Sequence, residues 1–205
     1  MDVLVNPQPF PPEIHPVREW FVPTRHFQCM RAWRSADVGR AAEQRFEDLG
    51  VAYGCTVSRS TPAQDAQEHW DVLIVLPSTE GGARYQVDVK AMKKLERNDA
   101  VASMTHTYVE LHGKGRDNAG WLYAGRADLI AFEKPQGFLL CHRQALKDFV
   151  LARVDRTDVG HTPGLAALNT VYHRNTADHD QVTLVALADL EAFPHLVLAE
   201  WHDQL

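Results

Sequence analysis

The middle of this 205-residue chain contains two short stretches with strand-like patterns, joined through a pair of glycines. Residues 72–76 are all apolar and rich in β-branched side chains, which is typical of a buried strand. Residues 85–92 alternate, so that Gln86, Asp88 and Lys90 fall on one face and apolar side chains on the other. The pattern predicts a β-hairpin whose second strand carries a polar face.

The residues before this hairpin predict a helix followed by a strand. Apolar side chains recur every three or four positions after Ser35 or Asp37, either of which could cap a helix, and Gly50 is expected to end it. We expect a strand at 51–59 and a loop or short helical turn at 60–68.

The residues after the hairpin predict further strands, a long helix and a final segment that completes the sheet or packs on its back. A Pro-Gln-Gly turn between two apolar runs indicates a second antiparallel hairpin. The expected elements are a connector at 95–103, strands at 104–113, 128–132 and 138–142, a helix at 143–153, a strand at 182–187, a short helix capped near Asp189, and an apolar run at 196–199.

The composition indicates one domain preceded by an arm. With 45% hydrophobic residues the chain is long enough for one well-filled core. Residues 1–34 are rich in proline and then carry aromatic side chains among arginines, which predicts an extended arm docked on the body, with a DNA-contacting arm as the alternative. Residues 35–205 are expected to form a single domain, with an acidic segment from about residue 176.

The net charge of −6 comes from the C-terminal end of the chain. Residues 176–205 contain six acidic residues and no Lys or Arg, so the rest of the chain carries no net charge. Cationic clusters elsewhere could follow a phosphate backbone or could simply be solvated surface. Those considered for nucleic-acid binding are Lys93, Lys94, Arg97, Lys114 and Arg116.

Several classes of protein are disfavoured. The sequence contains neither the run of about eighteen apolar residues that a membrane span needs nor the pattern of a signal peptide, so we expect no membrane partner and a cytoplasmic location. Cys29, Cys55 and Cys141 are widely spaced and outside any CxxC, which disfavours a disulfide framework or a structural zinc site. The eleven histidines lack the spacing of a zinc enzyme.

The predicted hairpin groups side chains that could bind a metal. Asp71 opens its first strand, and Asp88 and Lys90 close its second. Mg²⁺ prefers oxygen ligands and usually takes one or two protein carboxylates, which Asp71 and Asp88 could supply. Lys90 lies on the same strand face as Asp88, where it could orient a water molecule or neutralise charge on a phosphate. The alternative is an ordinary hairpin with a solvated polar face.

The order of these motifs resembles the PD-(D/E)XK nuclease superfamily, including its restriction-endonuclease-like and Holliday-junction-resolvase-like members from phages and microbes. The resemblance covers roughly residues 37–153 and departs from the superfamily pattern in that Trp70, not proline, precedes Asp71. It implies an α/β fold with a mixed central β-sheet flanked by helices. The motifs that carry the resemblance are a helix with Glu43, then Asp71, then Asp88-Val89-Lys90, a strand with Glu110, Gly120-Trp121 and Ala127-Asp128-Leu129-Ile130.

The resemblance also implies roles for these residues. Asp71, Asp88 and the backbone carbonyl of Val89 would bind Mg²⁺, for which Mn²⁺ could substitute, and Lys90 would position or activate the attacking water. Glu43 would hold that water or a second metal, although the helix alone is equally consistent with a solvated acid. The reaction would be hydrolysis of a DNA phosphodiester bond by in-line attack.

Four further residues have open alternatives. Gln86 shares a face with Asp88 and could lie beside the metal or be an ordinary polar strand residue. Glu110 could approach the site from the adjoining strand or pair with an arginine. Trp121 and Tyr123 lie among basic residues and could stack on a base, or could plug the space between turn and sheet.

Two functions from different classes therefore remain. The first is a Mg²⁺-dependent deoxyribonuclease, as an endonuclease or branched-DNA resolvase in recombination or repair, with a homodimer as one way to supply two active sites. The second is a non-catalytic nucleic-acid-binding or assembly protein that keeps the nuclease fold. The presence of both carboxylates and Lys90 favours the first.

Overall fold

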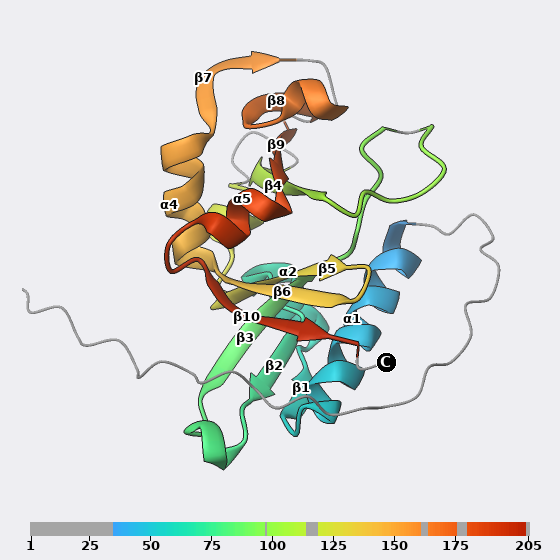
Figure 1. Cartoon of the computed structure of the whole chain (residues 1–205), viewed down its shortest axis with the longest axis vertical. Coiled ribbons are helices and arrows are strands. Elements are labelled where there is room, and N and C mark those ends of the chain that lie inside the picture. Colours follow the sequence, from blue (N-terminus) through green and yellow to red (C-terminus); the bar gives the residue numbers. More distant parts are fainter. Residues whose placement is uncertain (1–34, 97, 114–118, 161–163, 176–179, 204–205) are drawn as a thin grey trace, which may run out of the picture.

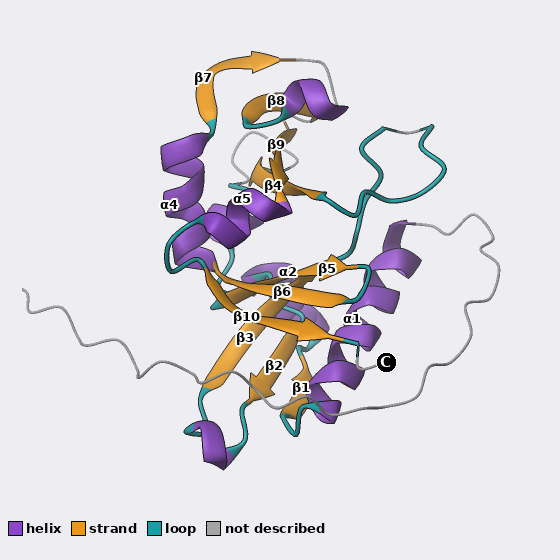
Figure 2. Ribbon diagram, in the orientation of Figure 1, coloured by secondary structure: helices purple, strands orange, loops and turns teal. Residues whose placement is uncertain are grey.

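The computed structural model describes residues 35–96, 98–113, 119–160, 164–175 and 180–203. These residues form two mixed β-sheets with helices packed on them (Figures 1 and 2). The predicted α/β class with a mixed central sheet flanked by helices is confirmed. The predicted arm at residues 1–34 lies outside the described residues, as do Arg97, Lys114 and Arg116.

The larger sheet contains both predicted hairpins and carries the candidate site. Every neighbouring pair of its strands is antiparallel except β3 and β5, which are parallel. The crossover between them runs through the second sheet. In spatial order the strands are β1 (Thr56–Arg59), β2 (Val72–Val75), β3 (Arg84–Lys90), β5 (Leu129–Lys134), β6 (Gly137–His142) and β10 (Val197–His202).

The smaller sheet joins the strand that follows the candidate site to the acidic end of the chain. Its first pairs are antiparallel, and only β8 and β7 run parallel. The strand order is β4 (His106–His112), β9 (Asp180–Ala186), β8 (Thr170–Asn175) and β7 (Asp155–Gly160). The acidic segment thus supplies one strand to each sheet, which confirms that it completes the sheet structure.

Helices cover both faces of the larger sheet (Figure 2). Helix α1 buries Ala42, Phe46 and Leu49 against one face. The other face packs on α4, α5 and the smaller sheet. Among the described residues no helix is long and apolar enough to cross a membrane. The helices are α1 (Ser35–Ala52), α2 (Pro62–Glu68), α3 (Trp121–Ala124), α4 (Arg143–Arg153) and α5 (Leu187–Ala192), with short 3-10 helices η1 (Ser78–Glu80) and η2 (Gly164–Ala167).

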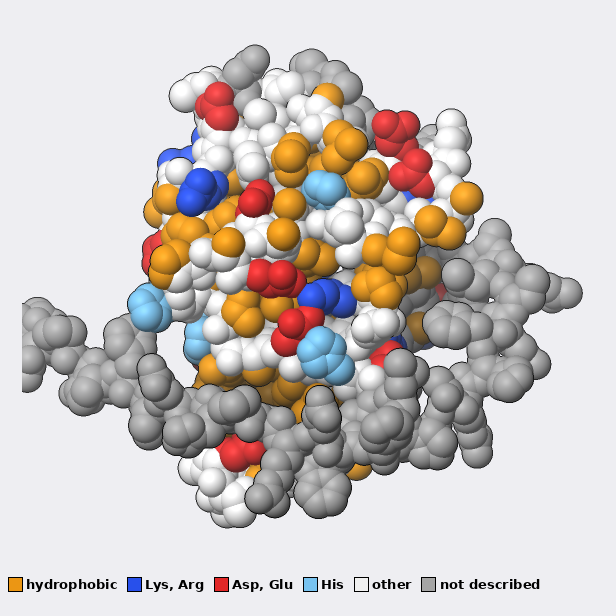
Figure 3. Space-filling model, viewed as in Figure 1, with side chains coloured by type: hydrophobic (Ala, Val, Ile, Leu, Met, Phe, Trp, Pro, Cys, Tyr) orange, Lys and Arg blue, Asp and Glu red, His pale blue; other side chains and the backbone are white. Residues whose placement is uncertain are grey.

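The edge strand β10 is held by two groups of ion pairs, which we call the β10 ion pairs. In the first, Arg45 of α1 binds Glu133 of β5 and Asp203 after β10. In the second, Lys134 binds Glu191 of α5 and Glu200 of β10. The face carrying β10 and α5 accordingly shows a basic side chain between acidic ones (Figure 3).

The end of α1 and the strand after it differ from the prediction. The helix runs through Gly50 to Ala52, and the chain turns at Gly54, where φ is +79°. Gly50 has a packing role instead, because a Cβ there would lie 3.0 Å from a Val57 methyl. Strand β1 therefore starts at Thr56, five residues later than expected.

Two further elements begin at different places from those predicted. Residues 62–68, left open as loop or helical turn, form α2, with Thr61 and Gln64 in a capping box. Helix α5 begins at Leu187, so Asp189 lies in its first turn and is not its cap. Helix α4 and the hairpin of β5 and β6 agree with the prediction.

Candidate active site at the ends of strands β2 and β3

Strand pairing brings Asp71 and Asp88 together. Val72 of β2 pairs with Val87 of β3 in an antiparallel arrangement. Asp71, the residue before Val72, therefore lies beside Asp88, the residue after Val87. The Asp71 N–H donates to the Val87 carbonyl at 2.9 Å, and Asp71 Oδ2 accepts from the Val89 N–H at 2.7 Å. Asp88 is only 4% exposed. The two carboxylates are thus positioned by backbone hydrogen bonds of the sheet.

The two carboxyl groups disturb each other's ionisation. Burial and then the charge of Asp88 raise the pKa of Asp71 to about 7. Burial also raises the pKa of Asp88, against the opposing effect of Lys90. The negative charge of Asp88 thus disfavours a second negative charge on Asp71. Without a cation the site resists carrying two negative charges.

Lys90 provides one positive charge beside this pair. Its Nζ lies 2.6 Å from Asp88 Oδ1, and its side chain is 21% exposed. The same Nζ lies 4.6 Å from the ring centroid of Trp121. The predicted grouping of Asp71, Asp88 and Lys90 is therefore present as geometry.

The donor set fits a hard divalent cation. Asp88 Oδ2 is buried, and among the described residues no N–H or O–H group donates to it. The described residues contain no group of three or more His, Cys, Asp or Glu side chains that could hold a metal ion. Two neighbouring carboxylates are nevertheless within the usual protein contribution to a Mg²⁺ site, where water and phosphate oxygens fill the other positions. A buried carboxylate oxygen to which no described residue donates, next to a second carboxyl group, fits this donor set.

Glu43 lies at the edge of the site, where its carboxylate also pairs with the guanidinium of Arg59. Burial raises its pKa, and the charge of Asp71 raises it further. Arg59 of β1 acts in the opposite direction, with Nη1 3.8 Å from Glu43 and Nε 2.6 Å from Glu47. The structure thus brings Glu43 within electrostatic range of Asp71, as part of a cluster with Arg59.

Glu110 faces the site from a different sheet than expected. Strand β4 pairs with β9 in the smaller sheet and does not adjoin β3, so the prediction of an adjoining strand is wrong. The residue instead lines a cavity of about 20 Å³ between the two sheets, together with Lys90, Lys93 and Trp121. This volume accommodates about one water molecule and excludes a nucleotide. A substrate strand would have to lie outside it.

The predicted nucleic-acid contacts fall into two groups. Lys93 and Lys94 are exposed directly after β3, and Tyr123 is 37% exposed with Lys147 Nζ 5.9 Å from its ring. Trp121 is different, because it is only 9% exposed and packs edge-on against Phe132. Its burial favours the structural alternative over stacking on a base.

Gln86 and Asp128 form a backbone clamp next to the site. The Gln86 N–H donates to Asp128 Oδ2 at 2.8 Å, and the Asp128 N–H donates to the Gln86 carbonyl at 2.8 Å. Asp128 therefore fixes the start of β5 against β3. Gln86 is half-buried on the same strand as Asp88.

Arg143 and Arg59 were not predicted to belong to the site. Arg143 donates from Nε to the Ala127 carbonyl at 2.6 Å and from Nη1 to the Leu122 carbonyl at 3.1 Å, and its charge reaches Asp88. Arg59 holds Glu43. The sequence did not predict these interactions, because Arg59 and Arg143 are separated in sequence from the carboxylates and belong to no local motif with them.

Comparisons with known proteins are sparse. The sequence matches no family model and no curated protein. Among solved structures, the chain resembles a bacterial homing endonuclease, I-Ssp6803I, with 16% identity and a TM-score of 0.38, over 54% of this chain and 70% of that one. Function is therefore inferred from the residues of the site.

Proposed function

We propose that this protein is a metal-dependent nuclease of the PD-(D/E)XK type that hydrolyses phosphodiester bonds of DNA. The observation that carries the proposal is the placement of half-buried Asp71 beside buried Asp88, with Lys90 Nζ 2.6 Å from Asp88. Burial that raises the pKa of two neighbouring acids is costly for a fold, whereas a divalent cation and an anionic substrate make the same arrangement useful.

The residues of the chain take distinct roles in this reaction. Asp71 and Asp88, with the Val89 carbonyl, would hold Mg²⁺ or Mn²⁺. When bound, the metal supplies Lewis-acid stabilisation of the phosphoryl oxygens and lowers the pKa of a coordinated water. Lys90 orients the attacking water and neutralises charge that grows on the phosphate. Glu43 accepts a hydrogen bond from the same water at the edge of the site.

DNA would approach from the solvent side of these groups. Lys93 and Lys94 are exposed immediately after the strand that carries Asp88 and Lys90. Tyr123 lies on α3, Arg126 follows that helix, and Lys147 lies on α4. The Arg126 side chain is 72% exposed. Such cations bind phosphates without reading sequence, and Tyr123 offers a ring for stacking.

An endonuclease or a branched-DNA resolvase fits best. A site with exposed cations close by in the chain, such as Lys93 and Lys94, suits cleavage within a strand. Cutting both strands of a junction calls for two sites, which a C2 homodimer would supply. The prediction of a role in recombination or repair follows from this substrate class.

Cleavage assays test the proposal directly. Wild type would be incubated with linear, supercoiled and four-way-junction DNA and with single-stranded RNA, each with Mg²⁺, Mn²⁺ or EDTA. We expect metal-dependent cutting of DNA that Asp88→Asn abolishes. The matched control is Asp148→Asn, which changes an exposed acid on α4 and should cut as wild type does.

Two results would contradict the nuclease. One is that neither metal supports cleavage of any substrate, and the other is that Asp88→Asn cuts as fast as wild type. Tight DNA binding without cleavage in a folded, metal-loaded protein would instead support the non-catalytic nucleic-acid-binding alternative.

A further inference from the structure

Lys90 has a second partner that the carboxylate chemistry does not require. Its Nζ binds Asp88 Oδ1 at 2.6 Å and lies 4.6 Å from the centroid of the Trp121 ring. An ammonium within about 6 Å of an indole face is attracted by the negative potential of the ring. Trp121 and Lys90 also line the same small cavity between the two sheets.

The indole is held in place by backbone contacts that leave little freedom. The Gly120 N–H donates to the Leu111 carbonyl, and a Cβ at Gly120 would lie 2.7 Å from the Glu110 carbonyl oxygen. Only glycine allows α3 to approach β4 so closely. The ring also packs edge-on against Phe132, which is fully buried and pairs in register with Lys90.

These contacts give Lys90 a defined position that its own side chain lacks. A lysine side chain has four rotatable bonds, and holding its end in one place costs conformational entropy. Asp88 alone fixes one direction of approach. The face of a buried indole adds a second contact to the same ammonium and needs no hydrogen-bond geometry.

We propose that Trp121 is a positioning residue that holds the Lys90 ammonium beside Asp88 through its indole face. This role in catalysis rests on the proposed nuclease function, whereas the placement of Lys90 does not. It differs from the expected role of Trp121 in stacking on a base, because the side chain that uses the ring belongs to the protein.

The placement of Lys90 is tested by NMR without any cleavage. Hydrogens above an aromatic face resonate upfield, so the Lys90 ε-methylene of protein labelled in its lysines should be shifted upfield of the other lysines. Lys90→Arg identifies the signal by removing it. Trp121→Met, which keeps an apolar side chain but no ring, should return the signal to the main group. A wild-type Lys90 signal at an ordinary position overturns the proposal, whether or not any Trp121 variant folds.

The catalytic consequence is tested by single-turnover cleavage with saturating DNA. Trp121→Met should lower the cleavage rate about tenfold, with little change in DNA affinity, and Trp121→Phe should recover most of that loss because it restores a ring. Phe149→Leu is the control for core packing, since Phe149 is buried in the same core and contacts Phe193.

The outcomes separate the two proposals. Suppose that Phe149→Leu and Trp121→Met lower the melting temperature equally and also slow cleavage equally. The effect is then one of general packing, and the positioning role is wrong. If Trp121→Met weakens DNA binding but not the cleavage rate, the ring contacts substrate and the role is again wrong. If wild type cleaves nothing, the nuclease proposal fails, while the NMR experiment still decides where Lys90 lies.

Discussion

Two clusters of charged side chains lie on the larger sheet, and they are built in opposite ways. In the β10 ion pairs, Arg45 binds Glu133 and Asp203 and also donates to the carbonyls of Lys134 and Pro135, each at 3.0 Å. At the candidate site, buried Asp88 pairs with Lys90 beside half-buried Asp71, and Asp88 Oδ2 receives no hydrogen bond from the described residues. Every charged group of the β10 ion pairs lies in an ion pair, whereas Asp88 at the candidate site keeps one buried carboxylate oxygen to which no described residue donates.

The pKa directions express the same difference. Burial alone would lower the pKa of Arg45, yet its hydrogen bonds to Asp203 and Glu133 raise it overall, so the ion pairs exceed the cost of burial. At the site burial prevails, and the pKa values of Asp71 and Asp88 both rise. A cluster that holds structure together stabilises its charges, whereas one prepared for a ligand does not.

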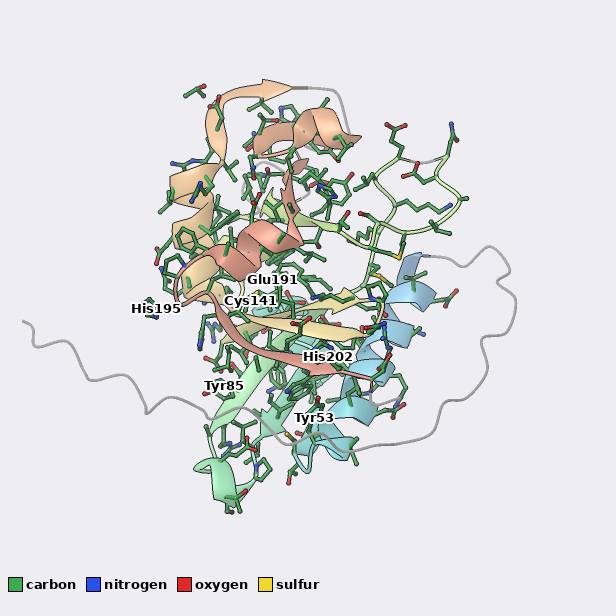
Figure 4. The ribbon with its side chains drawn as sticks, in the orientation of Figure 1. Tyr53, Tyr85, Cys141, Glu191, His195 and His202 are labelled. Carbon is green, nitrogen blue, oxygen red and sulfur yellow. The ribbon has the colours of Figure 1, made fainter. Side chains whose placement is uncertain are left out.

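Both clusters lie near the places where distant segments meet. His202 of β10 donates its N–H to the Tyr53 hydroxyl at 3.2 Å, and the Tyr53 ring stacks on Trp201. Figure 4 shows His202 on β10 and Tyr53 at the end of α1, with Glu191 on α5. The β10 ion pairs belong to this closing contact of the fold, and the candidate site lies where β2 begins and β3 ends.

The largest expected effect comes from Asp88→Asn. Cleavage should fall on the order of a thousandfold or more, because a metal ligand is lost. The melting temperature of the metal-free protein at neutral pH should stay equal or rise, since one of two facing carboxylates is removed. Kinetics and thermal unfolding measure the two effects. A large loss of stability would mean that Asp88 is structural, like the β10 ion pairs.

The second effect is a pH dependence that belongs to Asp71. Its pKa is about 7 in the folded protein against an ordinary 3.8, so between these values the folded state holds a proton that the unfolded state releases. The stability from this group is present below pH 3.8 and is lost as the pH rises through about 7. The slope reaches at most about 1.4 kcal/mol per pH unit.

Urea unfolding of the metal-free protein across this pH range measures that slope. Subtracting the same series for Asp71→Asn isolates the carboxyl group from the other titrating residues. Equal slopes for the two proteins would show that Asp71 ionises normally. Mg²⁺ should raise the midpoint of wild type more at pH 8 than at pH 5, because the proton competes with the cation.

Arg45→Met should give the reverse pattern from Asp88→Asn. It leaves Glu133 and Asp203 without their cation and should reduce the free energy of unfolding by about 1–2 kcal/mol, less than for a fully buried pair. Cleavage by the folded fraction should be unchanged. Chemical denaturation and an assay at low temperature measure both properties. A selective loss of cleavage would link this cluster to the site.

The smallest effect is expected from Arg59→Gln. Arg59 is 46% exposed, so its pairs with Glu43 and Glu47 should contribute less than about 1 kcal/mol to stability. The pKa of Glu43 should rise, because the charge that lowers it is removed. If Glu43 acts at the site, cleavage should fall by up to about fivefold near pH 6 and recover at higher pH. A pH profile identical to that of wild type would place Glu43 outside the reaction.

Local patterns were sufficient for much of the fold and for the centre of the site. The alternation at 85–92 predicted a strand with Asp88 and Lys90 on one face, and the structure has β3 there, paired with β2. Periodicity alone also located α4 at Arg143–Arg153. Such patterns succeed because they reflect which side of an element is buried, a property of neighbouring residues.

Other features could not be obtained in this way. Gly50 looked like a helix end, but its lack of a side chain serves contact with Val57 and Trp201. Glu110 looked like part of an adjoining strand, but β4 pairs with β9, more than seventy residues later. Both errors have one cause, since a local signal for glycine or for a strand does not name the tertiary partner.

The sequence by itself determined the types of side chain at the site, their order and the hairpin that carries them. Tertiary structure decided that half-buried Asp71 lies beside buried Asp88, that the Trp121 ring faces Lys90, and that Arg59 pairs with Glu43. The physical reason is that strand and helix periodicity act over a few residues. Burial, charge interaction and ring contacts depend on segments that meet only when the sheets assemble.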